Sequence, residues 1–282
     1  MLIDLKQILE LAERNNVAVP AFNMYNMESV IGVMRAARET GAPVIFQMFT
    51  RLADTEYGIF IANSIREAVR QLRTPAAFHL DHGAGLPEVV RALRLGVSGA
   101  MLDASTLPLE ENIARTRAAV DLCRECGVPV EGELGHVGSA ADEKSGAFTD
   151  VAEAKRFAEE TGVSALAVMV GTAHGVYKQS PVLEIQRLRD IREATGLPLV
   201  LHGGSGVPAE QLQMAVDAGI RKVNFATDLC HTFWETVYAA NGTVKPMDVL
   251  MEAPIDAIRQ YAVMRIKQLG ADRIAPAGAG QA

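Results

Sequence analysis

Residues 195–206, Thr-Gly-Leu-Pro-Leu-Val-Leu-His-Gly-Gly-Ser-Gly, decide the fold that we expect. Thr195-Gly196 is typical of a helix end, and Pro198 just after it indicates that a new element begins. The short apolar run to Leu201 predicts a buried strand. That strand ends at His202 and a glycine-rich turn. One short stretch therefore predicts a helix end, a strand and a polar strand end.

The same order recurs along the chain. Helix ends also precede apolar runs at Thr40-Gly-Ala-Pro43 and Cys126-Gly-Val-Pro129. The longer segments between these runs carry apolar residues at i, i+3 and i+4, which predicts helices. The predicted strands are 17–22, 43–48, 75–81, 98–103, 128–134, 164–170, 197–202 and 221–226.

Eight strands that alternate with helices predict an α/β fold, a single (β/α)₈ TIM barrel with an additional C-terminal helix over residues 1–274. The nearly continuous apolar strands are typical of a parallel sheet covered on both faces. An open doubly wound sheet is the alternative, but no G-x-G-x-x-G follows the first strand and no Walker sequence is present. The small residues of the tail, 275–282, predict disorder.

Composition limits the classes of function. The 282 residues are 49% hydrophobic and 22% charged, which is typical of a globular protein, and the net charge of −7 indicates no nucleic-acid partner. We expect no signal peptide, no transmembrane helix and no membrane partner, hence a cytoplasmic protein. Three cysteines are too few for a disulfide framework. Cys123 and Cys126 form a C-x-x-C at a helix end, either an incidental pair or a redox or metal pair.

Three histidines, His82, His174 and His202, each follow a short apolar run. The carboxyl ends of barrel strands converge on one mouth, where active sites of this fold lie. Imidazoles from separate strand ends suit zinc or another divalent transition metal, and a fourth coordination position stays open for substrate. The alternative for each is a hydrogen-bonded residue near the core. The remaining histidines are not expected to be ligands, although the first could orient one: His79, His136 and His231.

Carboxylates lie at the same strand ends. Asp81 adjoins His82 and is placed to act as a general acid/base, or alternatively to orient a histidine. Asp103 follows the next strand. Glu131 and Glu133 alternate on one face of their strand, so both can point inward, and one of them can be a buried structural partner.

Two turns predict an anion site. Gly203–Gly206 and Asn224–Asp228 each open a helix, where exposed backbone N–H groups bind phosphate. Phosphate sites of barrels commonly follow strands seven and eight, which is where these turns lie. A metal, an acid/base carboxylate and a phosphate site together predict a phosphorylated substrate whose carbonyl or hydroxyl group is polarised. Carbon–carbon bond cleavage in a sugar phosphate is the reaction we expect.

The motifs occur nearly from end to end of the chain. They are Ala21-Phe-Asn23 with Asn26, His79-Leu-Asp-His-Gly83, Leu102-Asp-Ala-Ser105 with Glu110-Glu-Asn-Ile113, Val130-Glu-Gly-Glu-Leu-Gly135, Gly171-Thr-Ala-His-Gly175, Leu201-His-Gly-Gly-Ser-Gly206 and Asn224-Phe-Ala-Thr-Asp228. With these motifs in this order, the chain resembles the class II, metal-dependent ketose-bisphosphate aldolases, which are the fructose- and tagatose-bisphosphate aldolase family.

The resemblance implies reversible cleavage of a ketose 1-phosphate or 1,6-bisphosphate to dihydroxyacetone phosphate and an aldehyde. It implies catalytic Zn²⁺ on His82, His174 and His202, with Asp81 as the acid/base. It further implies a homodimer or homotetramer, and in some members a monovalent cation beside the phosphate. Asp103 and Glu133 match positions that bind a second or alternative metal. Segments that hold dihydroxyacetone phosphate match Asn23, Gly175, Gly203, Gly204, Ser205, Asn224, Phe225, Ala226 and Thr227.

Three departures from the family pattern concern the aldehyde half of the substrate. The family has a mobile glutamate where the loop 137–143 carries Ala141, which leaves Asp142 and Glu143 as candidates for proton transfer. A common histidine is replaced by Thr106, and a small hydroxyl residue is replaced by Phe49. The resemblance therefore supports the dihydroxyacetone-phosphate half and leaves the aldehyde open.

Two other functions stay open from the sequence. One is a metal-dependent epimerase or hydrolase of a sugar phosphate on the same barrel. The other is a non-catalytic, aldolase-like subunit. A Schiff-base mechanism is disfavoured, because Lys222 lies at the wrong end of its strand and Lys178 lies in a loop.

Overall fold

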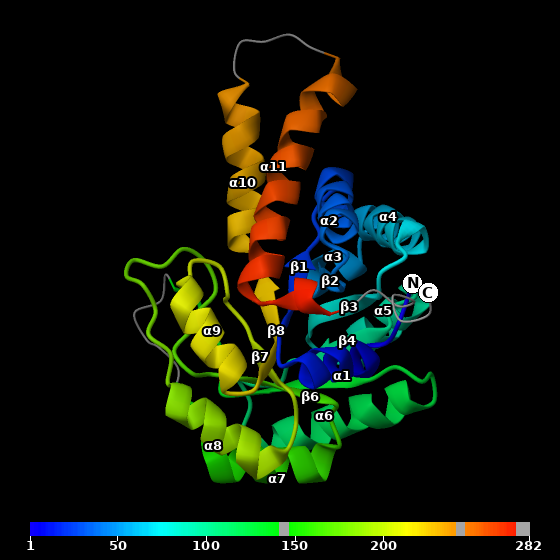
Figure 1. The fold of residues 1–282 in the computed structure, drawn as a ribbon. Coiled ribbons are helices and arrows are strands. Elements are labelled where there is room, and N and C mark those ends of the chain that lie inside the picture. The colour runs from blue at the N-terminus through cyan, green and yellow to red at the C-terminus, as the bar shows by residue number, and fades with distance from the viewer. Residues whose placement is uncertain (141–146, 241–245, 275–282) are drawn as a thin grey trace, which may run out of the picture.

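The computed structural model describes residues 1–140, 147–240 and 246–274. Its eight strands are parallel and close into a barrel in chain order (Figure 1), which confirms the predicted (β/α)₈ fold. The strands are β1 (Val19–Asn23), β2 (Val44–Phe49), β3 (Ala76–Gly83), β4 (Gly99–Leu102), β5 (Val130–Leu134), β6 (Ala165–Val168), β7 (Leu199–Leu201) and β8 (Ile220–Phe225).

Helices surround this barrel, and α10 and α11 form a hairpin that projects beyond it (Figure 1). They are α1 (Leu5–Asn15), α2 (Met27–Thr40), α3 (Thr50–Ala53), α4 (Glu56–Gln71), α5 (Leu86–Leu95), α6 (Leu109–Arg124), α7 (Val151–Thr161), α8 (Ile185–Thr195), α9 (Ala209–Asp217), α10 (Thr227–Ala239) and α11 (Met247–Gln268), followed by the 3₁₀ turn η1 (Ala271–Arg273). Helix α11 is the predicted additional helix. The tail predicted to be disordered, 275–282, lies outside the described residues.

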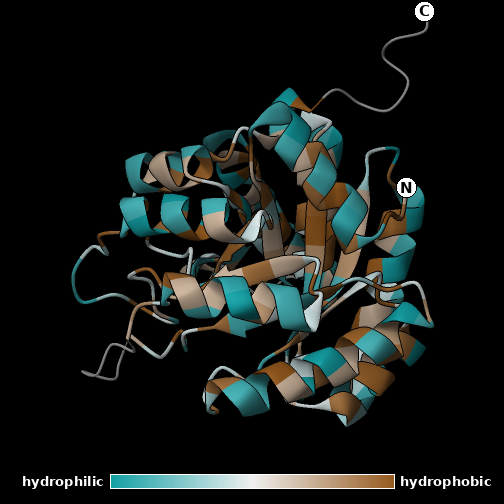
Figure 2. Ribbon diagram, turned by 90° about the horizontal axis from the view of Figure 1, so that it is seen from below, coloured by the Kyte–Doolittle hydropathy of each residue, from teal (hydrophilic) through white to brown (hydrophobic). Residues whose placement is uncertain are grey.

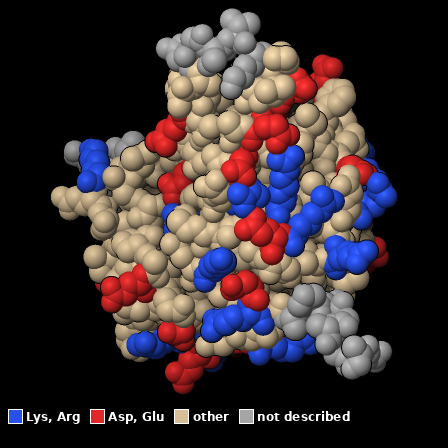
Figure 3. Space-filling view, turned by 45° about the horizontal axis from the view of Figure 1, so that its top comes forward, with Lys and Arg blue, Asp and Glu red and all other residues tan. Residues whose placement is uncertain are grey.

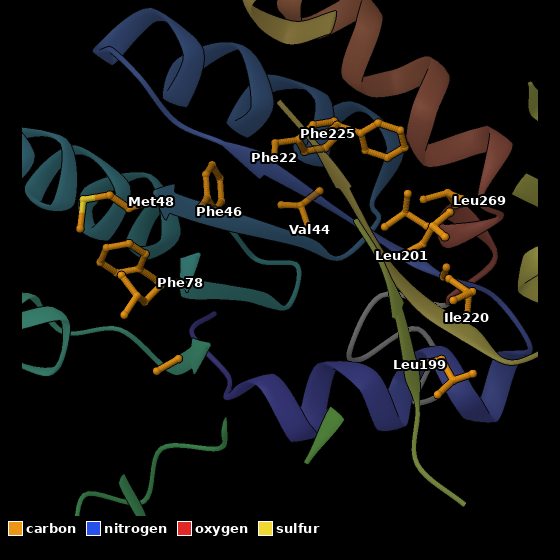
Figure 4. Close-up of a cluster of buried hydrophobic side chains, with 14 of the residues drawn as sticks. Phe22, Val44, Phe46, Met48, Phe78, Leu199, Leu201, Ile220, Phe225 and Leu269 are labelled. Atoms are coloured by element: carbon orange, nitrogen blue, oxygen red, sulfur yellow. The ribbon is translucent and has the colours of Figure 1, made fainter. Parts of the chain in front are cut away.

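Strand β2 shows how the barrel separates its two faces. Val44, Phe46 and Met48 pack in the layer between strands and helices (Figure 4). Ile45 and Gln47 lie between these residues in the strand and point into the barrel, because successive side chains of a strand point to opposite faces of the sheet. Hydrophobic residues accordingly occupy the central strands in Figure 2.

The barrel interior is apolar at its amino-terminal end. Small side chains such as Ala21, Ala77 and Ala167 fill it, and Leu5 and Ile8 of α1 pack against them. Helix α1 therefore closes this end of the barrel. The polar side chains that are at most 5% exposed include His79, Glu131 and Lys222 within their strands and, nearer the carboxyl ends, Asn23, Gln47, Asp81, Glu133, His202 and Asn224.

The end of β3 is irregular. The register with β4 shifts between Leu80 and Gly83, as in a β-bulge. Within this bulge His82 has φ +52°, a left-handed backbone conformation that costs a residue with a Cβ about 1–2 kcal/mol. Residues in such conformations cluster at functional sites, where surrounding structure holds them.

Strand β6 ends earlier than predicted. The expected strand ran over 164–170, but Met169 donates its N–H to Thr149 Oγ1 and the Val170 carbonyl accepts from Glu184 N–H. Loop segments therefore take the hydrogen bonds that a neighbouring strand would need. Apolarity alone does not distinguish a strand from a buried segment that pairs with loops.

On the face shown in Figure 3, acidic and basic side chains lie beside one another. Among the described helices, none is long and apolar enough to cross a membrane. Cys123 is buried and Cys126 is exposed, and both are free thiols at the end of α6.

Candidate active site

A cavity of about 540 Å³ opens at the carboxyl ends of the strands. Polar side chains from β1, β3 and β8 reach its floor, and loops form its rim. The lining residues are Asn23, Tyr25, Phe49, Arg51, Asp81, His82, Asp103, His136, Val137, Gly138, Ser139, His174, Gly175, Gly203, Ser205, Asn224, Ala226 and Thr227.

The three predicted histidines meet beside this cavity. Their ring centroids lie 5.0 Å apart for His82 and His174, 4.7 Å for His82 and His202, and 5.8 Å for His174 and His202. One nitrogen from each ring lies within 4.8 Å of the other two. This spacing is that of ligands around one metal ion.

Two of these rings are held by carboxylates. His82 Nδ1 lies 2.8 Å from Asp103 Oδ2, and His202 Nε2 lies 2.9 Å from Glu131 Oε1. An ionised carboxylate only accepts hydrogen bonds, so each of these nitrogens carries the proton. The other nitrogens, His82 Nε2 and His202 Nδ1, face each other across 3.0 Å.

Two imidazole nitrogens this close repel each other unless a proton or a metal ion lies between them. Two nitrogens that bind one tetrahedral zinc ion lie about 3.4 Å apart, close to the separation found here. His174 Nε2 is buried and has no partner among the described residues. The side chains present therefore fit a divalent metal, with carboxylates orienting two of its ligands.

A second set of ligand atoms overlaps the first. His82, Asp103 and Glu133 also place one ligand atom each within 4.8 Å of the others. Glu133 is fully buried, and its Oε2 has no hydrogen-bond partner among the described residues. The structure thus brings together all five residues that the sequence predicted as metal ligands.

The pKa shifts show what charge this cluster prefers. Burial lowers the pKa of His82, but Asp81 and Asp103 outweigh it and raise the pKa to about 9. Burial lowers the pKa of His174 to about 4, and burial together with Asp103 raises the pKa of Glu133 to about 8. Without a metal, this cluster therefore holds at least one extra proton near neutral pH. A bound divalent cation would take the place of that positive charge.

Asp81 is fixed beside the histidines by two amides. Its Oδ2 accepts from Asn23 Nδ2 at 2.7 Å and its Oδ1 accepts from Asn224 Nδ2 at 3.2 Å. Gln47 Nε2 donates in turn to Asn23 Oδ1 at 3.0 Å. Asp81 Oδ1 lies 4.0 Å from His82 Nε2, so an acid/base carboxylate adjoins the metal-binding nitrogens.

A buried layer supports the site from below. Lys222 Nζ donates to Glu131 Oε2 at 2.8 Å, and both side chains are fully buried. His79 Nε2 lies 3.4 Å from the same oxygen, and burial lowers the pKa of His79 to about 3. Lys222 is thus the counter-ion of the glutamate that orients His202, as expected of a lysine not used for a Schiff base.

The two predicted phosphate turns adjoin each other. Gly204 donates its N–H to the Asn224 carbonyl at 3.0 Å, and a Cβ at Gly204 would lie 2.4 Å from Val223 Cγ1. The backbone N–H groups of Ser205 and Thr227 donate to no described atom of the protein. Thr227 begins α10, so these donors suit an anion at a helix start.

A buried arginine ties these turns together. Arg265 of α11 donates to Asp228 Oδ2 at 2.7 Å, and Gly206 N–H donates to the same oxygen at 3.1 Å. Asp228 N–H donates to Ser205 Oγ at 3.2 Å. Helix α11 thereby fixes the spacing between the turn after β7 and the turn after β8.

Some predicted site residues are not brought to the cavity. Phe225 is fully buried, with its ring 5.7 Å from that of Phe22 and 4.8 Å from the Arg265 guanidinium, because β8 alternates and Asn224 takes the inward position. Asp142 and Glu143 lie outside the described residues.

Among the residues that line or support the cavity and that sequence reasoning missed are two tyrosines and an arginine. Tyr177 accepts from Ala173 N–H and donates to the Gly203 carbonyl, both at 2.8 Å, which joins the His174 loop to the phosphate turn. Tyr25 and Arg51 line the cavity. Both follow strand ends closely, so their position past β1 and β2 is the signal that could have found them.

Comparisons with known proteins agree with this geometry. The model of the protein family described as fructose-bisphosphate aldolase class-II matches residues 3–273. The crystal structure of the YdjI aldolase from Escherichia coli K12 is 33% identical, with a TM-score of 0.88 over 96% of this chain and 98% of that chain.

A putative fructose-1,6-bisphosphate aldolase from Coccidioides immitis is 26% identical, with a TM-score of 0.88 over 95% of this chain and 96% of that chain. The fructose-bisphosphate aldolase of Campylobacter jejuni, 23% identical, shares the fold, with a TM-score of 0.82 over 96% of each chain. Because the family match covers nearly the whole chain and its relatives are aldolases, the chain belongs to the class II fructose-bisphosphate aldolase family.

Proposed function

We propose that the chain is a divalent-metal-dependent aldolase that cleaves a ketose 1-phosphate or 1,6-bisphosphate to dihydroxyacetone phosphate and an aldehyde. The proposal includes Zn²⁺ as the metal, on His82, His174 and His202, with Asp103 and Glu133 as an alternative set. It also includes a homodimer or homotetramer in the cytoplasm, as the family resemblance implies.

One observation carries the proposal. His82 Nε2 and His202 Nδ1 face each other at 3.0 Å, each on a ring whose other nitrogen contacts a carboxylate, and Asp81 lies 4.0 Å from the first of them. A cation site next to a fixed carboxylate is what retro-aldol cleavage requires. When bound, the cation would supply Lewis-acid polarisation of the substrate carbonyl.

The proton steps follow from the positions of the side chains. The Asp81 carboxylate takes the proton of the C4 hydroxyl, the C3–C4 bond breaks, and C4 becomes the aldehyde carbon. The electron pair stays at C3, next to the C2 carbonyl. Asn23 and Asn224 keep Asp81 oriented by donating to its two oxygens.

A proton delivered to C3 completes dihydroxyacetone phosphate. We propose Asp142 or Glu143 for this step, because both closely follow Ala141, which stands where the family carries its mobile glutamate. The free N–H groups of Ser205 and Thr227 would hold the phosphate and so fix C1 to C3 against the metal-binding nitrogens.

The test is a coupled assay for dihydroxyacetone phosphate with the purified protein. A chelator should abolish product formation, and added Zn²⁺ should restore it. Metal should also raise the melting temperature of the chelated protein, because a ligand that binds only the folded state stabilises it. Activity that survives complete metal removal would refute the proposal.

The same assay separates the alternatives. An epimerase or hydrolase would consume a sugar phosphate without releasing an aldehyde, and a non-catalytic subunit would release nothing. Borohydride with substrate should not inactivate the enzyme, whereas trapping on Lys222 or Lys178 would indicate a Schiff base. The pairing of Lys222 with Glu131 at 2.8 Å argues against that outcome.

A further inference from the structure

Among the described residues that line the active-site cavity, Arg51 is the single lysine or arginine. It lies in α3, two residues beyond the end of β2, and its side chain is exposed. Its guanidinium carbon lies 5.2 Å from the centre of the Phe49 ring and 5.8 Å from that of the Tyr25 ring. Two aromatic rings therefore hold a cation at the rim of the cavity.

Within the described residues, Arg51 makes no ion pair and no hydrogen bond. The acid nearest to it in the sequence, Asp54, is bonded instead to Arg91 Nε at 2.7 Å. The fork of donors on Arg51 is thus open to the cavity. Arginines that recognise carboxylate or phosphate use this fork in a bidentate manner.

The position of Arg51 decides which part of a substrate it would meet. Phe49 is the register partner of Asp81 in the β2–β3 pairing, and its ring lies 5.6 Å from that of His82. Asp81 acts on the hydroxyl of the aldehyde half. One phosphate turn follows β7, which lies opposite β3 in the closed barrel, and the other follows β8, which β1 separates from β2. Arg51 consequently lies on the aldehyde side of the metal-binding residues.

We infer that Arg51, held between Tyr25 and Phe49, binds an anionic group on the far end of the aldehyde half, so that the substrate is a ketose 1-phosphate with a second anion, carboxylate or phosphate, at its other end. This inference rests on the proposed aldolase function and narrows its substrate. Phe49 then has two tasks: it packs on His82 and supports the guanidinium. The inference gives a physical role to an aromatic residue at a position where the family carries a small hydroxyl residue.

The experiment runs the reaction in the condensation direction, with dihydroxyacetone phosphate and a set of aldehydes. The set contains a hydroxyaldehyde that ends in a carboxylate, glyceraldehyde 3-phosphate, and neutral glyceraldehyde. The parent enzyme should show a higher kcat/KM with one or both anionic aldehydes than with the neutral one. The anionic aldehyde with the higher kcat/KM shows whether the second anion of the substrate is a carboxylate or a phosphate.

Arg51→Met should then reduce kcat/KM for the preferred anionic aldehyde by about 10- to 100-fold more than for glyceraldehyde, as expected for a hydrogen-bonded charge pair. Arg51→Lys keeps the charge and should recover part of that preference. Arg73→Met is the matched control, because Arg73 is exposed and lies just before β3, at the other end of the barrel.

Two results would overturn the inference. If Arg51→Met slowed all three aldehydes equally, the arginine would act on the shared dihydroxyacetone phosphate. If the preference were unchanged, the anion would be bound elsewhere. A protein that condenses no aldehyde at all would instead refute the proposed function, and with it this substrate assignment.

Discussion

The two halves of the cavity are built differently. The half after β7 and β8 presents backbone N–H groups, on turns that Asp228 and the buried Arg265 tie together. The half after β1 and β2 presents side chains on short segments, among them the exposed Arg51. The first half is fixed by the fold, whereas the second can change residue by residue.

This difference separates what every substrate of the enzyme would share from what distinguishes one substrate from another. The backbone N–H groups and the buried ion pair of the first half cannot be altered without moving the strand ends. Exposed side chains on a loop can be replaced at little cost in stability. Mutations in the first half should therefore affect all substrates alike, and mutations in the second half should change preference among aldehydes.

The largest effect is expected at Asp81, between the two halves. Asp81→Ala removes the base that takes the hydroxyl proton and should lower kcat by about 10²- to 10⁴-fold with every substrate. Asp81→Asn keeps the shape and should be as slow, while metal content stays at the parent level. Unchanged turnover in Asp81→Ala would refute the acid/base role.

The tie between the phosphate turns should give the next largest effect. Arg265→Met removes the guanidinium that donates to Asp228 at 2.7 Å and should lower the free energy of unfolding by about 1.5–3 kcal/mol. Because the turns then lose their spacing, KM for dihydroxyacetone phosphate should rise for all aldehydes. Urea unfolding and condensation kinetics measure the two effects.

Arg259→Met is a suitable control for this variant, because its ion pairs with Asp256 and Glu39 lie at the surface. Exposed pairs contribute little to stability, so this control should stay within about 1 kcal/mol of the parent. A change in KM for only one aldehyde in Arg265→Met would contradict the assignment of this region to the shared half.

A smaller change to the same half is Gly204→Ala. The added Cβ would lie 2.4 Å from Val223 Cγ1 and 2.9 Å from the Asn224 carbonyl oxygen, so the turn must shift. We expect KM for dihydroxyacetone phosphate to rise by about 10-fold, since each 1.4 kcal/mol of lost binding is a factor of ten. Gly85→Ala lies outside the cavity lining and brings its Cβ no closer than 3.4 Å to any described atom, so it should leave KM near the parent value.

The smallest effect concerns the layer below both halves. The pKa of His79 is lowered to about 3 by burial, from 6.5 in the unfolded chain, so the unfolded state takes up the proton first as pH falls. The stability that neutral His79 contributes is therefore complete above about pH 6.5 and is lost as pH falls toward 3. By about pH 5 the loss should reach about 2 kcal/mol.

His79→Gln removes this titration. The urea midpoint of the variant should fall less between pH 7 and pH 5 than that of the parent, whatever its absolute stability. If the urea midpoints of the two proteins fell by the same amount between pH 7 and pH 5, His79 would not titrate as its burial implies.

The barrel and most of its site follow from local patterns in the sequence. Apolar runs that end in polar residues predict the strands, and β8 in particular obeys the alternation that sends Asn224 inward. The same alternation sends Phe225 to the core, a consequence that reading the motif Asn224–Asp228 as one unit overlooks. A motif names positions, whereas the pleat of the strand decides which side chains reach the site.

Other parts of the site have no local signal. Arg265 lies far along the chain from Asp228, in a helix whose apolar pattern gives no reason for a buried cation. The contact between them depends on how α11 packs against the barrel. The pairing of Lys222 with Glu131 likewise joins two strands across the barrel, and no spacing in the sequence predicts it.

The backbone of His82 has a consequence for laboratory evolution. At φ +52°, glycine would be the less costly residue, so the metal ligand occupies a position where selection for folding alone favours its loss. Rounds of selection for heat resistance in the presence of a chelator should therefore enrich glycine or asparagine at position 82 early. The same selection with metal present should retain the histidine, because binding then contributes to the stability that is being selected.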